Sequence, residues 1–277
     1  MQTDRRLLPA NDHVAASELR GVVEAPRYDD GAWHRVQVPV ADLLRAPGGP
    51  RERQLLYGQR VRVFDTRDGH AFLQSERDGF VGYLDTAALG TDAQPTHRVH
   101  RAATHLYPAP DLKRIEICGL SHGALLTITG TAGNYLQTDA GHFVPSGHVS
   151  PVEARDDDPV AVAELYLGTP YLWGGNSRAG IDCSGLVQAA LLACGIPCPG
   201  DSDMQEQALG AALPEGTPAR RGDLFFWKGH VAMAVDEGRI IHANARAMAV
   251  SFEPLQSAIA RIEAAGDGPP TSHRRLG

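Results

Sequence analysis

Cysteine is scarce in this 277-residue sequence, which contains four, and aromatic residues make up only 6% of it. Four cysteines could form two disulfides, but the first residues lack the apolar segment of a secretory signal, so we expect free thiols and a cytoplasmic location. Cys194 and Cys198 do not have the Cys-x-x-Cys spacing of a zinc site, and no nearby histidine completes a ligand set. We therefore expect no metal site.

Long apolar runs and an excess of positive charge are also missing. No stretch approaches the roughly 20 apolar residues that a transmembrane helix needs, so no membrane span is expected. The formal net charge of −7 argues against general nucleic-acid binding, which relies on basic surfaces. With 43% hydrophobic and 21% charged residues, the composition is that of an ordinary globular protein, and the length is sufficient for two or three domains.

Short β-strand patterns fill the first half of the sequence. Turns rich in glycine and aspartate, such as residues 67–69 and 77–79, separate the strands, which is typical of a small β-barrel. The strands expected in this first barrel are residues 38–44, 54–57, 61–64, 71–75 and 80–84.

The strand region contains an internal repeat. Residues 72–75 recur in similar form as 135–138, and residues 80–81 recur as 143–144, at the same offset of 63 (135 − 72 and 143 − 80). A shared offset in two places indicates duplication. The predicted organisation is an N-terminal arm (1–36) with one short helical stretch near 14–23, two barrels (37–90 and 91–150), a polar linker (151–158) and a last domain (159–277) that ends in a loose tail (264–277).

The stretch from Tyr171 to Gly195 organises the rest of the chain. A glycine-rich loop ends at Asp182-Cys183-Ser184, and an apolar helical pattern follows as far as Gly195. Cys183 is therefore expected in the opening turn of a buried helix. Backbone N–H groups and the positive end of the helix dipole stabilise a thiolate there and could hold the oxyanion of a tetrahedral intermediate. Taken alone, Cys183 is more simply explained as a buried structural thiol.

Two histidines supply the base that a cysteine nucleophile needs. His230 and His242 lie 12 positions apart (242 − 230) on two successive strand patterns joined by a tight turn at 236–238. Antiparallel pairing would bring the two rings within hydrogen-bonding reach, so that His230 takes the thiol proton and His242 fixes its tautomer and orientation. The alternative for His242 is a packed core histidine.

Together these motifs resemble the NlpC/P60 cysteine peptidases. The resemblance implies a papain-like α+β domain, with the cysteine helix packed on an antiparallel sheet, and cleavage of γ-D-glutamyl bonds in cell-wall peptides. The glycine–aromatic–valine pattern near the end of each barrel is similar to bacterial SH3-like (SH3b) domains. The predicted fold class is therefore α+β, a papain-like catalytic domain preceded by two small SH3-like β-barrels. The segments that carry the peptidase resemblance are 171–175, 182–186, 222–224, 229–231 and 241–243.

The resemblance also implies substrate-binding residues around the cysteine. Tyr171 would lie beside the nucleophile as a donor to the oxyanion or the substrate, with Trp173 nearby, although both could instead be core aromatics. Asp182 and Ser184 would contact the D-glutamyl portion of the substrate. As helix-capping groups, these two would only stabilise the helix.

A second set of residues would recognise a free α-ammonium group. Three-domain relatives use an acidic and a hydroxyl residue after the cysteine helix, here Asp201 and Ser202, with an acidic and an aromatic residue of the first barrel, for which Glu52 and Tyr83 are candidates. An acylated amine carries no positive charge and could not form the bond between carboxylate and ammonium. Family members commonly have arginine where this chain has Gly200, which puts local ion pairing in question. A helix cap, an exposed glutamate and a packed tyrosine are the simpler explanations.

These inferences predict a cysteine peptidase that cleaves the γ-D-Glu–diamino acid bond of short murein peptides with a free N-terminal L-Ala, as in cell-wall peptide recycling. Such a mechanism requires no metal or organic cofactor, and the expected partner is the murein stem peptide itself. One alternative is an exported endopeptidase that acts on intact peptidoglycan, with the barrels as wall anchors. Others are a non-catalytic SH3b peptide-binding protein and an acyltransferase or amidase of related fold.

Overall fold

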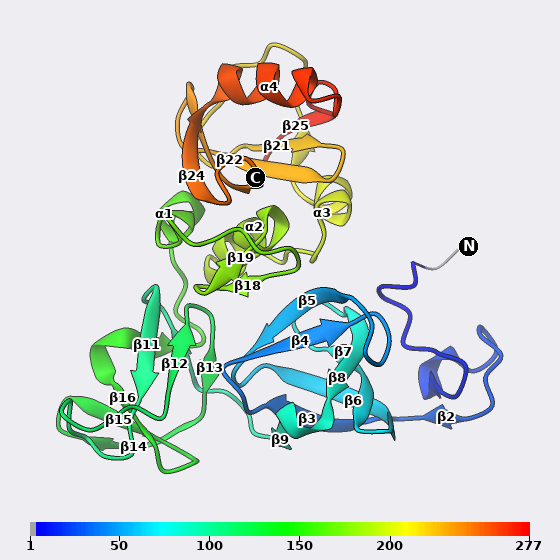
Figure 1. Ribbon diagram of the computed structural model, residues 1–277, viewed down its shortest axis with the longest axis vertical. Helices are drawn as coiled ribbons and strands as arrows, with labels where there is room; N and C mark the ends of the chain where they lie inside the picture. Colours follow the sequence, from blue (N-terminus) through cyan, green and yellow to red (C-terminus); the bar gives the residue numbers. More distant parts are fainter. Residues whose placement is uncertain (1–3) are drawn as a thin grey trace. The chain divides into compact units, whose positions relative to one another are not determined.

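The computed structural model describes residues 4–277, so residues 1–3 of the predicted arm lie outside it. The chain divides into two compact units, the first ending at Val152 and the second running from Glu153 to Gly277 (Figure 1). Within residues 4–277, no helix is long and apolar enough to cross a membrane.

The first unit is built on a seven-stranded antiparallel sheet in the order β5-β4-β8-β7-β6-β3-β9. Asp68 and Gly69, with positive φ angles of 48° and 77°, form the two-residue turn between β6 and β7, and the twist of such a turn suits a hairpin. Leu43, Leu73 and Phe80 lie in its core. The strands are β3 (Ala32–Val36), β4 (Val40–Leu44), β5 (Arg51–Leu56), β6 (Arg60–Arg67), β7 (His70–Ser75), β8 (Val81–Asp85) and β9 (Leu89–Thr91), and the 3-10 turn η2 (Thr86–Ala88) precedes β9.

This sheet agrees with most of the strand pattern. Strands β4 to β8 correspond to the five predicted strands, with ends shifted by a few residues. The sheet also contains β3, which lies in the segment predicted as an arm, and β9, which ends just after residue 90. The sheet therefore begins earlier in the chain than its turn signals indicate.

The helical stretch predicted near residues 14–23 is reduced to the single 3-10 turn η1 (Ser17–Leu19). The residues before it form strand β1 (Ala15–Ala16), which pairs in parallel with β2 (Tyr28–Asp29). Val14 and Ala16 are buried against Phe64 and neighbouring apolar side chains of the sheet. Burial of an extended segment outweighs its weak helical propensity.

Residues 97–151 form three small antiparallel sheets rather than one continuous sheet, in the orders β13-β10-β17, β11-β12 and β14-β15-β16. Their core includes Leu56 and Tyr57 from the first sheet, and the N–H of Leu125 donates to the Tyr57 carbonyl at 2.8 Å. The two β regions therefore pack together. The elements are β10 (His97–Val99), β11 (Ala103–Leu106), β12 (Cys118–Ser121), β13 (Leu125–Leu126), β14 (Ile128–Ala132), β15 (Tyr135–Thr138), β16 (Phe143–Pro145), η3 (Ser146–His148) and β17 (Val149–Pro151).

The repeated segments lie in corresponding hairpins. Residues 72–75 lie in β7, which pairs with β8, and residues 135–138 form β15, which pairs with β16. In the first hairpin the N–H of Ser75 donates to the carbonyl of Phe80, and in the second the N–H of Thr138 donates to the carbonyl of His142. The hydrogen bond that closes the loop therefore spans five positions in the first hairpin (80 − 75) and four in the second (142 − 138).

The second unit contains a six-stranded antiparallel sheet in the order β20-β25-β21-β22-β23-β24. Alternate side chains of β21 and β22 point to opposite faces, Phe226 and Val231 to one face and Phe225 and Ala232 to the other. Helices α1 (Pro159–Glu164) and α2 (Cys183–Ala193) cover the first of these faces and α4 (Leu255–Ala264) covers the second (Figure 1), so the unit is an α+β fold. The strands are β20 (Ala211–Ala212), β21 (Leu224–Trp227), β22 (His230–Ala234), β23 (Arg239–Asn244), β24 (Ala249–Pro254) and β25 (Ser272–Arg275).

Helix α1 begins at a residue with recognisable capping chemistry. Asp158 Oδ1 accepts a hydrogen bond from the N–H of Val160 at 2.9 Å, with Pro159 at the first helical position, as the sequence predicts. The helices are α1 (Pro159–Glu164), α2 (Cys183–Ala193), α3 (Ser202–Ala208) and α4 (Leu255–Ala264), and a small hairpin of β18 (Asn176–Ser177) and β19 (Gly180–Ile181) precedes α2.

The loose tail predicted for residues 264–277 is wrong, because β25 lies between β20 and β21. Asp223, only 1% exposed, accepts hydrogen bonds from Arg275 Nε at 2.7 Å and is in contact with His273 Nε2 at 2.8 Å. A buried carboxylate requires such partners, and β25 supplies both of them.

Candidate active site

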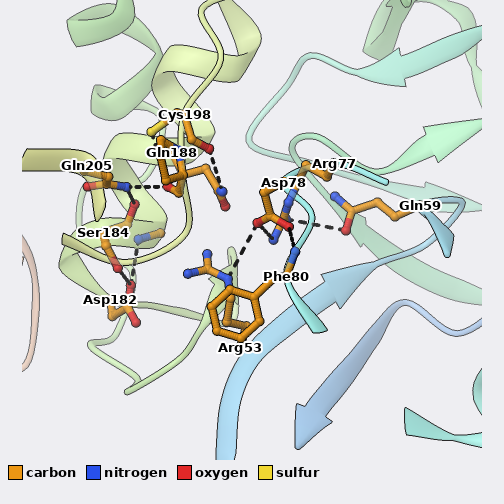
Figure 2. A network of polar contacts seen from close by, with 12 residues as sticks. Arg53, Gln59, Arg77, Asp78, Phe80, Asp182, Ser184, Gln188, Cys198 and Gln205 are labelled. Atoms are coloured by element: carbon orange, nitrogen blue, oxygen red, sulfur yellow. Dashed lines mark hydrogen bonds and ion pairs between the residues drawn. The ribbon is translucent and has the colours of Figure 1, made fainter. Parts of the chain in front are cut away.

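Cys183 is the first residue of α2, and the loop before it is fixed by Asp182. Oδ1 of Asp182 accepts from the N–H of Gly185 at 2.7 Å and from the Ser184 hydroxyl at 3.1 Å, while Oδ2 accepts from the N–H of Gly174 at 2.9 Å (Figure 2). Asp182 is thus the N-cap of α2, and it also ties the glycine-rich loop to the helix that carries Cys183.

The glycines of this loop allow the backbone to approach α2 closely. A Cβ atom on Gly185 would lie 2.6 Å from the carbonyl oxygen of Gly175, and one on Gly175 would lie 2.5 Å from the carbonyl oxygen of Gly180. Both distances are too short for any side chain, so the loop packs directly on the first turn of the helix.

His230 and His242 are in direct contact, as strand pairing predicts. His230 begins β22 and His242 lies in β23, and the two strands pair antiparallel. Nε2 of His230 lies 3.0 Å from Nδ1 of His242, and the ring centroids are 5.2 Å apart. One imidazole therefore orients the other.

The sulfur of Cys183 lies close to the start of β22, where the backbone N–H of Val231, the residue after His230, favours the thiolate and so acts to lower the pKa of the thiol. Helix α2 packs against β22, and Cys183 is part of the core between them. The fold thus brings the Cys183 end of α2 close to the strand that begins at His230.

Burial determines the charge state of these groups. It raises the pKa of the Cys183 thiol to about 12, and the charge of Asp182 adds to this, whereas backbone N–H groups such as that of Val231 act in the opposite direction. Burial lowers the pKa of His230 to about 3 and that of His242 to about 4. The helix terminus favours a thiolate, as predicted, but burial outweighs it. Both the thiol and the imidazoles are neutral at pH 7, and charge forms only when a proton moves between them.

Sequence patterns gave no indication of Glu253, which lies behind His242. Oε2 of Glu253 is 3.1 Å from Nε2 of His242, a close contact between a carboxylate and an imidazole that lacks the alignment of a full hydrogen bond. Arg261 of α4 donates to both Glu253 oxygens, at 2.9 and 2.7 Å, and holds the pKa of Glu253 below its usual range. Continuing the strand pairing from β23 to β24, where Ile240 pairs with Glu253, is the signal that could have found it.

Two family models match the chain. Residues 168–265 match the NlpC/P60 family, and residues 43–89 match the bacterial dipeptidyl-peptidase Sh3 domain. A γ-D-glutamyl-L-lysine dipeptidyl-peptidase from Bacillus cereus is 34% identical over 240 residues, which are 74% of this chain and 71% of that protein. The chain belongs to the NlpC/P60 family of cysteine peptidases. The resemblance drawn from the motifs is confirmed.

Other relatives agree with this membership of the NlpC/P60 family. A dipeptidyl-peptidase 6 from Lysinibacillus sphaericus is 28% identical over 69% of this chain and 79% of its own length. The crystal structure of an NlpC/P60 family protein from Bacillus cereus superposes with a TM-score of 0.75 at 22% identity, over 88% of this chain and 99% of that one, and so shows a common fold. The Sh3 match supports an SH3-type domain in the first β region.

Within the NlpC/P60 unit, the predicted aromatic residues have different environments. Tyr171 is half-buried, and burial, with the charges of Cys183 and Asp182, raises the pKa of its hydroxyl, which therefore stays protonated close to the sulfur. Trp173 is 69% exposed, which rules out the alternative of a core aromatic for this residue. Ser184 is buried and bonded to Asp182, as a helix-capping residue would be.

Asp201 and Ser202 lie at the start of α3, which is tied to the nucleophile helix. Asp201 is the N-cap of α3 and forms no side-chain capping bond. Gln205, one turn further, donates from Nε2 to the carbonyl of Ser184 at 2.9 Å (Figure 2). This bond fixes the first turn of α3 beside the first turn of the cysteine helix.

Glu52 and Tyr83 belong to the other compact unit. They lie on β5 and β8, the two strands that flank Leu44 of β4, so the structure does bring them to one region of the first sheet. Glu52 accepts two hydrogen bonds from Arg5, and the Tyr83 hydroxyl accepts from Asn11 Nδ2 at 3.0 Å. Both side chains therefore have partners in the N-terminal segment.

No group of three or more histidine, cysteine, aspartate or glutamate side chains within residues 4–277 is arranged to hold a metal ion. The side chains near Cys183 and the two histidines supply a thiol, imidazoles and a phenol, with backbone N–H donors nearby.

Burial of neutral His242 should make the protein less stable in acid. In the unfolded chain histidine takes up a proton below about pH 6.5, whereas folded His242 stays neutral down to about pH 4, so the unfolded state gains stability as the pH falls between these values. From pH 7 to 5.5 this contributes a loss of about 1 kcal/mol. Urea unfolding at both pH values should show a smaller loss for His242→Gln than for the unchanged chain. Equal losses would contradict a neutral, buried His242.

Proposed function

We propose that this chain hydrolyses the γ-D-Glu–diamino acid bond of short murein peptides. The observation that carries the proposal is the contact between buried His242 and half-buried His230, whose ring nitrogens are 3.0 Å apart, with His230 on the strand whose start lies close to the sulfur of Cys183. Such a set converts a neutral thiol into a nucleophile. The substrate class is supported by the Bacillus relatives, which are γ-D-glutamyl-L-lysine dipeptidyl-peptidases.

In the proposed reaction, the Cys183 proton passes to His230 as the sulfur attacks the γ-carbonyl carbon of D-Glu. The tetrahedral intermediate collapses to a thioester, and protonated His230 gives its proton to the departing amine of the diamino acid. Water, deprotonated by His230, then attacks the thioester and releases the dipeptide and the free thiol. N–H groups at the start of α2 and the protonated Tyr171 hydroxyl are the donors proposed for the oxyanion.

We further propose that a free N-terminal L-Ala is required. Asp201 and Ser202, held beside the cysteine helix through Gln205, would bind its ammonium. In the first unit, Glu52 already pairs with a cation, the Arg5 guanidinium, which supports a cation-binding role for this carboxylate, with Tyr83 as the aromatic candidate in the same sheet. Asp182 and Ser184 would contact the D-glutamyl portion, and the exposed Trp173 would cover the substrate.

The domain organisation and location are part of this proposal. We propose that the β region of residues 91–150 is a second SH3-like barrel, related to the first barrel (37–90) by duplication, with residues 151–158 as the linker to the peptidase domain. The corresponding hairpins of β7–β8 and β15–β16 support a common origin. A role in cytoplasmic peptide recycling is supported by the cysteines, since none of the four is in a disulfide.

The test is product analysis by mass spectrometry on L-Ala-γ-D-Glu-diaminopimelate and its N-acetylated form. Cleavage of the free peptide into L-Ala-D-Glu and diaminopimelate is expected, with at least about 100-fold lower kcat/KM for the acetylated form, because the carboxylate proposed to bind the ammonium would lose its partner. Equal rates on both peptides, or activity on intact peptidoglycan, would instead favour an endopeptidase that acts on the wall. Binding without cleavage would favour a peptide-binding protein.

A further inference from the structure

His242 has a second close neighbour besides His230. Its Nδ1 lies 3.0 Å from Nε2 of His230, and its Nε2 lies 3.1 Å from Oε2 of Glu253. The His242 side chain is 0% exposed and that of Glu253 is 11% exposed. The two ring nitrogens of His242 therefore face an imidazole on one side and a carboxylate on the other, away from solvent.

Two arginines keep this carboxylate charged. Arg261 donates from Nε and NH2 to the two oxygens of Glu253, and NH1 of Arg246 lies 3.5 Å from Oε1. The arginines come from α4 and from the loop between β23 and β24, while His242 comes from β23. Glu253 is consequently an anion at neutral pH, with its position fixed on three sides.

The charged carboxylate decides which nitrogen of His242 carries the proton. A neutral imidazole has one N–H and one lone pair. A lone pair on Nε2 would point at the Glu253 carboxylate and be repelled, so the proton lies on Nε2 and the lone pair on Nδ1. Nδ1 of His242 then accepts a hydrogen bond, and Nε2 of His230 must be the donor.

This arrangement leaves the lone pair of His230 on Nδ1, where a base is needed. Nε2 of His230 is occupied by His242, so only Nδ1 can take the proton of Cys183. In the opposite arrangement His242 would donate from Nδ1, and His230 would carry its own proton on Nδ1. No acceptor would then remain for the thiol proton.

We propose that Glu253 is a positioning residue that sets the protonation sites of both histidines and thereby makes His230 able to accept the proton of Cys183. The inference rests on the proposed cysteine-peptidase function and deepens it. When the proton moves from sulfur to Nδ1 of His230, the positive charge on that imidazole is also stabilised through His242 by the carboxylate.

The ring protons can be located directly by nuclear magnetic resonance. Long-range 1H–15N correlation spectra of the 15N-labelled full chain at pH 7 distinguish protonated from unprotonated ring nitrogens, and spectra of His230→Gln and His242→Gln assign the signals. We expect protonated Nε2 and unprotonated Nδ1 on both histidines. A protonated Nδ1 on His242 would overturn the proposal.

Glu253→Gln tests the consequence for catalysis. The amide is neutral and can donate to Nε2 of His242, which permits the opposite tautomer. We expect kcat on the murein tripeptide to fall at least about tenfold, with KM changed by less than about twofold, and the proton of His242 to appear on Nδ1. A purely structural role would lower the melting temperature and leave the tautomer unchanged. Wild-type kcat with unchanged histidine signals would contradict the proposal.

A matched control removes a similar ion pair elsewhere. Glu18 in the first unit accepts from NH1 and NH2 of Arg62 at 2.7 and 3.3 Å, so Glu18→Gln loses the same charge and the same kind of contact. This variant should keep the kcat and the histidine signals of the unchanged chain.

A failure of the Glu253 proposal can be distinguished from a failure of the proposed substrate. If the unchanged chain does not cleave the tripeptide, the proposed substrate is wrong, yet the spectra still locate the histidine protons. In that case the rate of Cys183 alkylation by iodoacetamide, followed by peptide mass spectrometry, replaces kcat. The Glu253→Gln variant should then react at least about tenfold more slowly at pH 7, and an unchanged rate would count against the proposal.

Discussion

Cys183→Ala should lower kcat on L-Ala-γ-D-Glu-diaminopimelate by at least about four orders of magnitude, because the thioester cannot form without the sulfur. The fold should survive. Cys183 is buried in the core of the second unit, and losing one sulfur atom there costs about 1 kcal/mol, less than the stability of a typical domain. Steady-state kinetics measures the first effect, and urea unfolding followed by circular dichroism measures the second.

Cys194→Ala is the matched control for this prediction. Cys194 follows the last residue of the same helix, is partly buried and is not in a disulfide. Its replacement should leave kcat within about twofold of the unchanged chain, since it lies three turns from the candidate nucleophile. Substantial turnover by the Cys183 variant would refute the thioester mechanism.

Gly58→Ala should destabilise the first unit by at least about 3 kcal/mol. Gly58 has a φ of 77°, and a Cβ atom there would lie 2.0 Å from the carbonyl oxygen of Leu125 and 2.6 Å from its carbon. These are backbone atoms of the second β region, so the added Cβ atom can be accommodated only if the two β regions separate. Hydrogen exchange followed by mass spectrometry should show lost protection in peptides from residues 36–64 and 118–128.

Gly69→Ala separates this contact from backbone strain. Gly69 also has a φ of 77°, but a Cβ atom added to it in the β6–β7 turn would meet nothing within 4 Å. Its replacement should cost only about 1 kcal/mol, which is the strain of a left-handed alanine. If both variants lose the same protection from hydrogen exchange, the contact between the two β regions does not contribute to the effect of Gly58→Ala.

The contact between the two histidines could be predicted from the sequence because it depends on local features. The turn at residues 236–238 joins β22 to β23 directly, so the antiparallel pairing that brings His230 to His242 follows from the strand pattern alone. The N-terminal position of Cys183 in α2 is equally local, since Asp182 and the preceding glycines mark the start of the helix.

Glu253 could not be found in the same way, because its contact depends on the register between β23 and β24. That register is set by the loop at residues 245–248. Met248 in this loop has a positive φ of 50°, which is unusual for methionine and could not be predicted from its residue type. The effect of burial on Cys183 was missed for a related reason, because the capping chemistry of a helix is visible in the sequence and the depth of its burial is not.

The errors at the two ends of the chain also have a tertiary cause. Residues 14–23 and 264–277 have weak local patterns, and both are ordered by partners far away in the sequence. Phe64 and its apolar neighbours hold the first segment, and Asp223 holds the second through Arg275 and His273. Local propensity cannot reveal such partners.

The place of β25 in the sheet has a consequence for how the enzyme is made. Because β25 lies between β20 and β21, a chain still emerging from the ribosome exposes one edge of β21 and leaves Asp223 without its side-chain partners Arg275 and His273. The sheet that supports the histidines is complete only after residues 272–275 have left the exit tunnel and docked. This unit can therefore begin catalysis only after these residues have been synthesised and have docked.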